Sequence, residues 1–273
     1  MDQIQSYTFK LEDTLDKLAS PLKPHIPTLA RFLLVVTFLE DSVRLVMQWS
    51  SQLYYMQQYR GFPAGVSHLF LLANVGLMVG CSGMAIARKH TELAVGGLFL
   101  VVVSQALAYG FVFDFNFFMR NMSIIGALLL LLSESLSASR RKSMFAGLPT
   151  LSEVDRSQYF QLAGRVLLIL LFLSFILSGE MTLLRGLVSL VGLIACVMVV
   201  VGFKAKWSAM FLVLFLSIFN VLINNWWDID YNPTHRDFVK YDFFQTLSIM
   251  GGLLLLVSLG PGGISVDEKK KAF

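Results

Sequence analysis

The sequence has few charged residues for its length. Asp, Glu, Lys and Arg together make up 15% of its 273 residues, whereas soluble domains carry about 25%. Apolar residues make up 56% of the chain, and soluble proteins rarely expose apolar patches beyond a few hundred square ångströms. The composition therefore excludes a soluble globular fold and predicts an integral membrane protein.

The sequence also lacks the residue patterns of common enzyme sites. Its four histidines share no metal-ligand spacing. It has no Gly-rich phosphate loop after a strand, no Gly-x-Ser-x-Gly turn and no cysteine paired with a histidine at a usable spacing. The net charge of +4 is modest and does not indicate nucleic-acid binding. We therefore expect no enzymatic activity, no metal and no cofactor.

Only two cysteines are present, and both lie in apolar runs. Cys81 and Cys196 are surrounded in sequence by aliphatic and small residues. A free cysteine in such a setting behaves as a small hydrophobic residue. We expect both to be buried free thiols, which say little about the redox compartment.

Eight apolar segments approach the roughly 20 residues that cross a bilayer's hydrocarbon core. They predict an all-α integral membrane protein with about eight transmembrane helices, and a seven-span arrangement is the alternative. The segments are Thr28–Met47, Ser67–Ala87, Leu93–Phe113, Phe117–Leu132, Leu162–Leu177, Leu184–Phe203, Trp207–Asn225 and Phe243–Leu259.

The positions of Lys and Arg favour eight spans with both termini in the cytosol. On that assignment the cytosolic segments contain Lys10, Lys17, Lys23, Arg88, Lys89, Arg140, Arg141, Lys142, Arg156, Lys204, Lys206, Lys269, Lys270 and Lys271. The opposite side contains only Arg60, Arg185, Arg236 and Lys240. Cytosolic loops of membrane proteins are enriched in Lys and Arg. A seven-span arrangement would place basic clusters on both sides of the membrane.

Short segments recur at similar offsets and indicate an internal duplication. A unit with an even number of spans repeats in parallel orientation, about an axis along the membrane normal. The matching pairs are Ser123–Ser133 with Ser248–Ser258 (offset 125), Ala30–Leu34 with Gly164–Leu168 (offset 134) and Val75–Gly80 with Val191–Cys196 (offset 116).

The duplication predicts two parallel four-helix repeats. The predicted segments are a cytosolic N-terminal tail (1–27), a first repeat (28–133), a cytosolic linker (134–161), a second repeat (162–260) and a cytosolic tail (261–273). The two repeats differ in their non-cytosolic loops, which are longest at Gln48–Val66 and Trp226–Asp242. Insertions gathered on one face usually mark the working face of a repeat protein.

The first apolar segment contains a group of charged residues. Charges within a bilayer are costly, at about 2.5 to 3.5 kcal/mol each at a helix centre, so they are functional candidates. Glu40 and Arg44 lie four residues apart on one helical face, and Asp41 can also reach Arg44. One carboxylate is left over once Arg44 is paired. The group is either an acidic pocket for a cation, such as the amino group of a peptide, or a structural ion pair.

Other polar residues are predicted at the same non-cytosolic level. We take as candidate ligand-binding residues Glu40, Asp41, Arg44, Asp114, Arg120, Asn121, Asp228, Tyr241, Asp242 and Gln245. Tryptophans and tyrosines accompany them, at Trp49, Tyr54, Tyr55, Tyr59, Trp226, Trp227, Tyr231 and Tyr241. Acids and aromatic rings beside an apolar groove would suit a peptide with a free amine and large side chains. The alternative for the aromatic residues is an interfacial belt, where Trp and Tyr are common.

The chain ends in Lys270-Lys271-Ala-Phe. Lysines at the third and fourth positions from the carboxyl end have the form of a dilysine retrieval signal, which cytosolic coat subunits read. Anchoring at anionic headgroups would explain the charge but not the placement.

Several blocks of polar and loop residues resemble one family. They are Phe38–Asp41, Phe118–Asn121, Lys142–Gly147, Lys240–Thr246 and Leu259–Gly263, together with the closing lysines. From Pro24 to its end the chain resembles the surfeit-locus-four family of endoplasmic-reticulum cargo receptors.

The resemblance implies a receptor that cycles between the endoplasmic reticulum and the early Golgi. Such receptors bind soluble secretory proteins in the lumen, often through a short segment near the cargo's N-terminus, and enter COPII vesicles. Lys270 and Lys271 would then return the empty receptor through the COPI coat. The resemblance does not say which lumenal residues bind cargo, so the residues proposed above rest on charge and position alone.

A second hypothesis is a protein that handles lipids or transports a small solute. The four-span units faintly resemble small bacterial membrane proteins of the DoxX type. The residues that could line a path between the halves are Glu40, Arg44, Asn74, Gln105, Arg120 and Asn220. A path needs polar residues through the whole bilayer, whereas the strong charges here gather at one end, which favours the receptor. A third hypothesis is a scaffold without a lumenal ligand, and the sequence leaves open whether two copies act together.

Overall fold

The computed structural model describes residues 25–110, 113–143, 151–170, 183–229, 233–260 and 262–271. Every regular element in these residues is a helix, as the sequence predicts; the predicted N-terminal tail lies almost wholly outside them. The helices are α2 (Ile26–Met47), α3 (Trp49–Gln58), α4 (Ala64–Ile86), α5 (Thr91–Tyr109), α6 (Phe115–Ser143), α7 (Leu151–Leu168), α9 (Leu183–Val201), α10 (Ala205–Ile223), the 3₁₀ turn η2 (Trp226–Asp228), α11 (Pro233–Leu259) and α12 (Val266–Lys271).

Each of the eight predicted apolar segments overlaps one of these helices, and five helical stretches are long and apolar enough to cross a membrane. A multi-span, all-helical protein is therefore confirmed, while the count of eight spans stays a prediction. The five stretches are Ala64–Ile86, Thr91–Tyr109, Phe117–Ala138, Ala205–Asp228 and His235–Leu259.

Three of the eight predicted segments are not among these five stretches, and the reason differs for each. α2 has 22 residues but carries four charged side chains, which its packing against α4 and α11 partly buries. The segment predicted at Leu162–Leu177 extends past the described part of α7. In α9 the described apolar stretch is the shorter Leu190–Val201.

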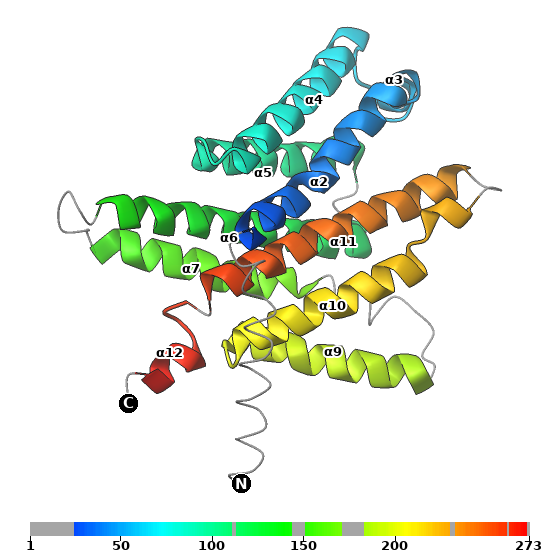
Figure 1. Ribbon diagram of the computed structural model, residues 1–273. Coiled ribbons are helices and arrows are strands. Elements are labelled where there is room, and N and C mark those ends of the chain that lie inside the picture. Colours follow the sequence, from blue (N-terminus) through cyan, green and yellow to red (C-terminus); the bar gives the residue numbers. More distant parts are fainter. Residues whose placement is uncertain are drawn as a thin grey trace.

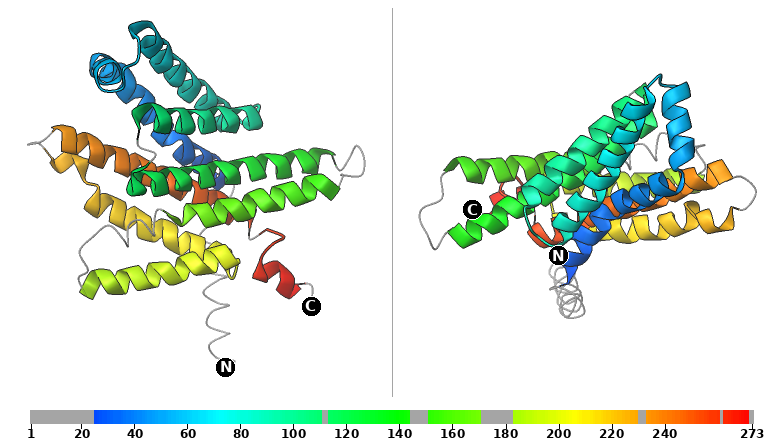
Figure 2. Two further views of the ribbon diagram at one scale, coloured as in Figure 1. Left: turned by 180° about the vertical axis from the view of Figure 1, so that it is seen from behind. Right: turned by 90° about the horizontal axis from the view of Figure 1, so that it is seen from above.

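The helices form a bundle whose centre is made by four of them. α2 lies along α11, α6 lies along α7, and α6 also packs on α11. The hairpins α4–α5 and α9–α10 flank this centre (Figures 1 and 2). The connections α4–α5 and α9–α10, the last turns of α6 and the first turns of α7 lie towards one end of the bundle, together with α12, and we call this the α12 end. α3 and η2 lie at the opposite end, the α3 end.

The two long loops that the sequence predicts contain helical structure. The first loop, Gln48–Val66, is largely α3 and the start of α4. The second, Trp226–Asp242, contains η2 and the first turns of α11. Both lie at the α3 end, so the larger insertions are on one side of the bundle.

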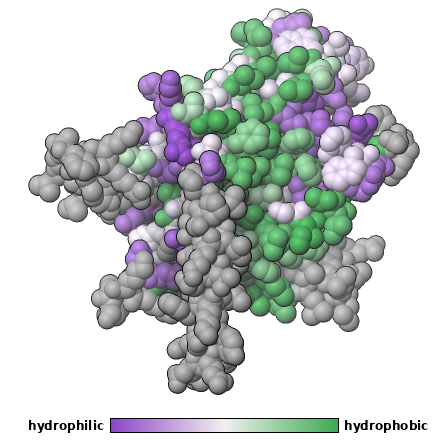
Figure 3. All heavy atoms as spheres, in the orientation of Figure 1, coloured by the Kyte–Doolittle hydropathy of each residue, from purple (hydrophilic) through white to green (hydrophobic). Residues whose placement is uncertain are grey.

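The surface has an apolar band between two hydrophilic ends. In Figure 3, which keeps the orientation of Figure 1, apolar residues cover the middle of the visible face, and hydrophilic residues gather to its left and right. Many large apolar side chains on α4, α5 and α10 are exposed, among them Leu72, Leu107 and Leu222. This distribution is the one expected of a bundle surrounded by lipid.

Helix contacts follow the offsets of the predicted repeat. Gly126 of α6 approaches α7 so closely that a Cβ atom would overlap with it, and Gly251 of α11 approaches α2 in the same way. The offset between the two glycines is 125. The residues that Gly126 meets are Gly164, Leu167 and Leu168, and those that Gly251 meets are Ala30, Leu33 and Leu34. The two sets of partners correspond at the offset of 134 found in the sequence.

The turns before α5 and α10 also correspond. Arg88 and His90 have left-handed backbone angles, with φ of 57° and 47°, and Gly202 and Lys204 have φ of 73° and 44°. Non-glycine residues rarely adopt such angles, so the shared spacing of two left-handed residues is informative. At the centre, Gly252 packs on Ala127, its counterpart at offset 125. These contacts are the ones that two parallel repeats about a common axis would make.

Candidate functional site

Most of the predicted site residues come together at the α3 end, where α2, α5, α6 and α11 meet. We call this group the α2–α11 polar cluster. Its members are Glu40, Asp41, Arg44, Gln105, Arg120, Lys240, Tyr241, Asp242 and Gln245.

Asp41 connects α2 to α5. It is buried, and one of its carboxylate oxygens accepts hydrogen bonds from Arg44, with the Nε donor at 3.1 Å. The other oxygen accepts a hydrogen bond of 2.8 Å from Nε2 of Gln105. Both carboxylate oxygens are thus occupied, because Asp41 and Arg44 share a helical face and Gln105 projects from the adjacent helix.

Glu40 pairs with a residue that the sequence reasoning left outside the site. Its Oε1 lies 3.0 Å from Nζ of Lys240 on α11. The expected pairing of Glu40 with Arg44 is therefore not the one formed, since Arg44 is taken by Asp41. The second oxygen, Oε2, is buried and has no hydrogen-bond partner in the described part of the bundle. The signal for Lys240 was its place among the few basic residues predicted on the non-cytosolic side, next to Tyr241.

Arg120 connects α6 to α11. Its guanidinium forms an ion pair with Asp242, while its Nε is buried and has no hydrogen-bond partner within the described ranges. Asp114 lies nearby on the exposed surface, where its Oδ1 accepts a 3.0 Å hydrogen bond from the backbone N–H of Phe117 and so caps the first turn of α6. Asp114 therefore has a local structural role at the edge of the cluster.

Tyr241 lies near two of the ion pairs, Asp41–Arg44 and Arg120–Asp242. The guanidinium of Arg44 lies over its ring, 5.4 Å from the centroid, a geometry in which the cation is attracted to the ring face. Tyr241 also interacts electrostatically with Glu40 and Arg120. Its ring therefore separates charges of both signs within the half-buried centre of the cluster.

Gln245 is the most buried member of the cluster. It follows Tyr241 by one helical turn, is 1% exposed, and neither its amide nitrogen nor its amide oxygen has a hydrogen-bond partner among the residues that the structure describes. Asn121, also buried, lies beside Arg120 on α6. An unpartnered buried amide is costly, because it loses its hydrogen bonds to water without replacement. Such a group is a candidate contact for a ligand.

Asp228 lies outside the cluster. It belongs to η2, is exposed, and accepts a hydrogen bond of 2.9 Å from the side chain of Asn225. Its neighbour Trp226 lies beside the cations of Arg236 and Lys240, at 5.6 Å from each. The aromatic residues of this turn are thus connected to the cluster through Lys240, but Asp228 is not.

The cluster carries balanced charge. Three acids, Glu40, Asp41 and Asp242, face three bases, Arg44, Arg120 and Lys240. A bare cation therefore finds no unpaired carboxylate there. What remains unpartnered is one carboxylate oxygen, one guanidinium N–H and one amide, which together offer hydrogen-bond acceptors and donors.

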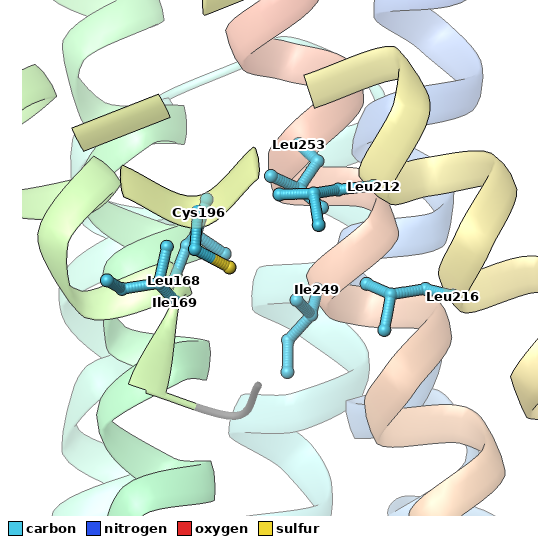
Figure 4. Close-up of a pocket in the computed structure, with 7 residues that line it drawn as sticks. All are labelled: Leu168, Ile169, Cys196, Leu212, Leu216, Ile249 and Leu253. Atoms are coloured by element: carbon cyan, nitrogen blue, oxygen red, sulfur yellow. The ribbon is translucent and has the colours of Figure 1, made fainter. Parts of the chain in front are cut away.

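A small cavity elsewhere in the bundle is apolar. Figure 4 shows side chains from α7, α9, α10 and α11 that line it: Leu168, Ile169, Cys196, Leu212, Leu216, Ile249 and Leu253. Cys196 and Cys81 are both buried free thiols, as expected. Within the described residues no three His, Cys, Asp or Glu side chains are grouped as a metal site would need. The polar cluster remains the strongest candidate for specific binding.

The two lysines of the predicted retrieval signal lie at the opposite end of the molecule. Lys270 and Lys271 are the last residues of α12. The predicted ligand-binding residues and the predicted retrieval signal are therefore separated by the length of the bundle (Figure 1).

Comparison with known proteins gives consistent matches over almost the whole chain. A model of the SURF4 family matches residues 5–273. A Surfeit locus protein 4 homolog of Schizosaccharomyces pombe is 47% identical over 256 residues, 93% of this chain and 84% of that protein. A Surfeit locus protein 4 homolog of Drosophila melanogaster is 44% identical over 265 residues, 97% of each chain. The ER-derived vesicles protein ERV29 of Saccharomyces cerevisiae is 38% identical over 273 residues, 98% of this chain and 85% of that protein. No solved structure matches the chain.

Proposed function

The chain belongs to the SURF4 family, and from this membership we propose that it is a receptor that packages soluble secretory proteins for export from the endoplasmic reticulum. The family and the apolar helices make it a multi-pass membrane protein of the early secretory pathway. On the proposed orientation both termini are cytosolic, and the α3 end faces the lumen. The proposal contains no catalytic step and no cofactor.

The observation that carries the proposal is the α2–α11 polar cluster. Its balanced ion pairs and unpartnered hydrogen-bonding groups suit a ligand that brings both donors and acceptors. A short peptide segment of a soluble cargo protein has both along its backbone. Exposed aromatic side chains of α3 and of the η2–α11 region, at Tyr54, Tyr59, Trp227 and Phe238, would contact its apolar side chains.

Coat recognition belongs to the α12 end in this proposal. The receptor enters COPII vesicles with its cargo, and the COPI coat returns it by binding Lys270 and Lys271. The two four-helix repeats would form one scaffold that holds the lumenal cluster at one end and the tail at the other. The matched glycine contacts of α6–α7 and α2–α11 support this arrangement.

A path for lipids is less well supported. Asn74 and Asn220 are the amides within the spans that could continue such a path. Asn74 donates to the Phe70 carbonyl and accepts a hydrogen bond from Ser104. Asn220 donates to the Phe243 carbonyl. Both side-chain amides are therefore used in hydrogen bonds within the helix bundle.

The test is a vesicle-budding assay on endoplasmic-reticulum membranes with and without the protein. We expect a defined subset of soluble lumenal proteins to be missing from the vesicles when the protein is absent, while membrane proteins still bud. If soluble cargo is packaged normally, the receptor function is wrong. Lipid movement across reconstituted bilayers would then test the second hypothesis.

A further inference from the structure

The chain after α11 stays against the bundle. Nε2 of Gln161, on α7, donates a hydrogen bond of 2.7 Å to the carbonyl oxygen of Gly260. One turn further along α7, Nη2 of Arg165 donates a 2.6 Å hydrogen bond to the carbonyl oxygen of Ile264. A Cβ atom at Gly262 would overlap with the Gln161 side chain, so the two segments are in close contact.

Asp267 continues this attachment onto α10. Its carboxylate accepts hydrogen bonds from the backbone N–H groups of Lys204 at 2.9 Å and Ala205 at 3.2 Å. Its own N–H donates to the carbonyl oxygen of Gly202 at 3.1 Å. An acidic side chain at a helix N-terminus satisfies free N–H groups and interacts well with the helix dipole. We call Gly260 and residues 262–267 the docked segment.

Docking shortens the reach of the two terminal lysines. Lys270 is three residues beyond Asp267, and an extended chain covers about 3.3 to 3.6 Å per residue, so Lys270 stays within about 10 Å of the attachment on α10. If the docked segment is released, the tether begins at Leu259 and has eleven residues, which extends to about 36 to 40 Å. A coat subunit that must surround the lysines and the carboxyl terminus has far more access to the released tail.

The docked state leaves a buried charge poorly satisfied. Arg165 is fully buried, and its Nε and Nη1 have no hydrogen-bond partner in the described part of the chain. Arg31, its counterpart at offset 134, instead bonds to Glu134 and to the carbonyl oxygen of Ala85. Unpartnered N–H groups of a buried guanidinium cost free energy. Release of the docked segment would give them access to water, which opposes the hydrogen bonds that favour docking.

We propose that the docked segment withholds Lys270 and Lys271 from the cytosolic coat and that its release from α7 and α10 presents them. The inference rests on the proposed function, which makes these lysines a retrieval signal. The surface that the docked segment binds is formed by Gln161, Arg165 and the N-terminus of α10. Its occupant is the protein's own tail, and the competing partner is the COPI coat.

The experiment measures the affinity of purified COPI coat for the full-length protein in lipid nanodiscs. Gln161→Ala and Asp267→Ala each remove hydrogen bonds of the docked segment and leave the last four residues unchanged. Loss of the Asp267 cap multiplies the released fraction by roughly two to thirty, and loss of the Gln161 hydrogen bond multiplies it by roughly two to ten. The apparent dissociation constant falls by the same factor while the released fraction is small, so we expect coat binding to tighten by the corresponding factor in each variant. Tyr159→Ala, on the exposed side of α7, is the matched control and leaves the affinity unchanged.

A further variant shows whether a negative result contradicts the docking inference or the retrieval signal itself. The double variant Lys270→Ser, Lys271→Ser should lose coat binding. If it does, and Gln161→Ala and Asp267→Ala bind as the unmodified protein does, the docking inference is overturned and the retrieval signal stands. If the double variant binds the coat normally, the retrieval part of the proposed function is wrong.

Hydrogen exchange in the unmodified protein gives a test that needs no substitution. The Lys204 and Ala205 amides, bonded to Asp267, should lose protection when coat is added at saturation. Unchanged protection with coat bound would show that the signal is read while docked, which contradicts the proposal.

Discussion

At the scale of single residues, the α2–α11 polar cluster depends on side chains with more than one partner. Asp41 binds Arg44 on its own helix and Gln105 on α5. Tyr241 lies under Arg44 and near Arg120. Because each group is shared, a change at one position alters the hydrogen bonds of several helices.

Asp41→Asn should therefore reduce cargo capture. The substitution removes the charge that Arg44 faces and leaves a partly buried guanidinium without its acid, and an ionic hydrogen bond of this kind corresponds to about tenfold or more in binding. Capture of soluble cargo into budded vesicles measures the effect, and Asp242→Asn should act similarly through Arg120. Asp228→Asn is the matched control, because Asp228 is exposed and outside the cluster. Equal capture by Asp41→Asn, Asp242→Asn and the control would exclude the cluster as the cargo site.

The Glu40–Lys240 pair predicts unequal effects of its two substitutions. Lys240→Met leaves Glu40, with 6% of its side chain exposed, as an unpaired buried acid, whereas Glu40→Gln leaves Lys240, 31% exposed, able to reach water. Breaking a buried pair costs about 3 to 5 kcal/mol when the remaining charge stays buried. We expect Lys240→Met to lower the thermal unfolding temperature in detergent more than Glu40→Gln. The double variant should recover part of the loss, and additive effects would show that the two residues do not interact.

At the scale of helices, small residues decide which pairs approach closely. Gly126 lets α6 contact the backbone of α7, and Gly251 lets α11 contact the backbone of α2. In a membrane, close helix packing depends on such small residues, because lipid chains are as apolar as the helix surfaces. The predicted repeat places these two glycines at equivalent positions.

Gly251→Ala should destabilise the α2–α11 pair. The added Cβ would overlap with the backbone of Leu34 and Ala30, and overpacking of this kind costs about 1 to 3 kcal/mol. Gly83→Ala is the control, since no atom lies within 4 Å of the added Cβ and alanine favours a helix over glycine. Thermal unfolding of both variants in detergent measures the difference. A Gly251→Ala protein as stable as Gly83→Ala would show that the helices separate without cost.

At the scale of the whole molecule, the distribution of Lys and Arg predicts the orientation. The α4–α5 turn contains Arg88 and Lys89, and the α3 end contains the acids of the polar cluster and most of the tyrosines. With the α3 end in the lumen, the basic turns face the cytosol. The tail, docked beside the basic α9–α10 turn, would then lie on the cytosolic side, where its release would present it to cytosolic coats.

Cysteine labelling in sealed microsomes tests this orientation. Both native cysteines are buried, so a membrane-impermeant thiol reagent should react mainly with introduced sites. Lys89→Cys, in the exposed α4–α5 turn, should be labelled in sealed vesicles. Tyr59→Cys, 70% exposed after α3, should be labelled only after the membrane is opened. The reverse pattern would show that the α3 end faces the cytosol, and the α2–α11 polar cluster could then not bind cargo in the lumen.

Composition and periodicity predicted the helical membrane class without any tertiary information. Apolar runs of suitable length, the offsets of 125 and 134 and the polar blocks around Asp41 and Asp242 are all local properties of the chain. They were sufficient for the family as well, because loop and polar blocks are specific where apolar runs are not. The burial of both cysteines also followed from local composition.

Partners far apart in the chain were decided only by the tertiary structure. Spacing along α2 allowed either Glu40 or Asp41 to pair with Arg44, and the selection depends on Lys240, which approaches from α11. The same is true of the separation of Asp228 from the cluster, of the isolation of the Gln245 amide, and of the docking of the tail on Gln161 and the N-terminus of α10. Hydrogen bonds and ion pairs are short-range and directional, so their partners are set by how the helices pack.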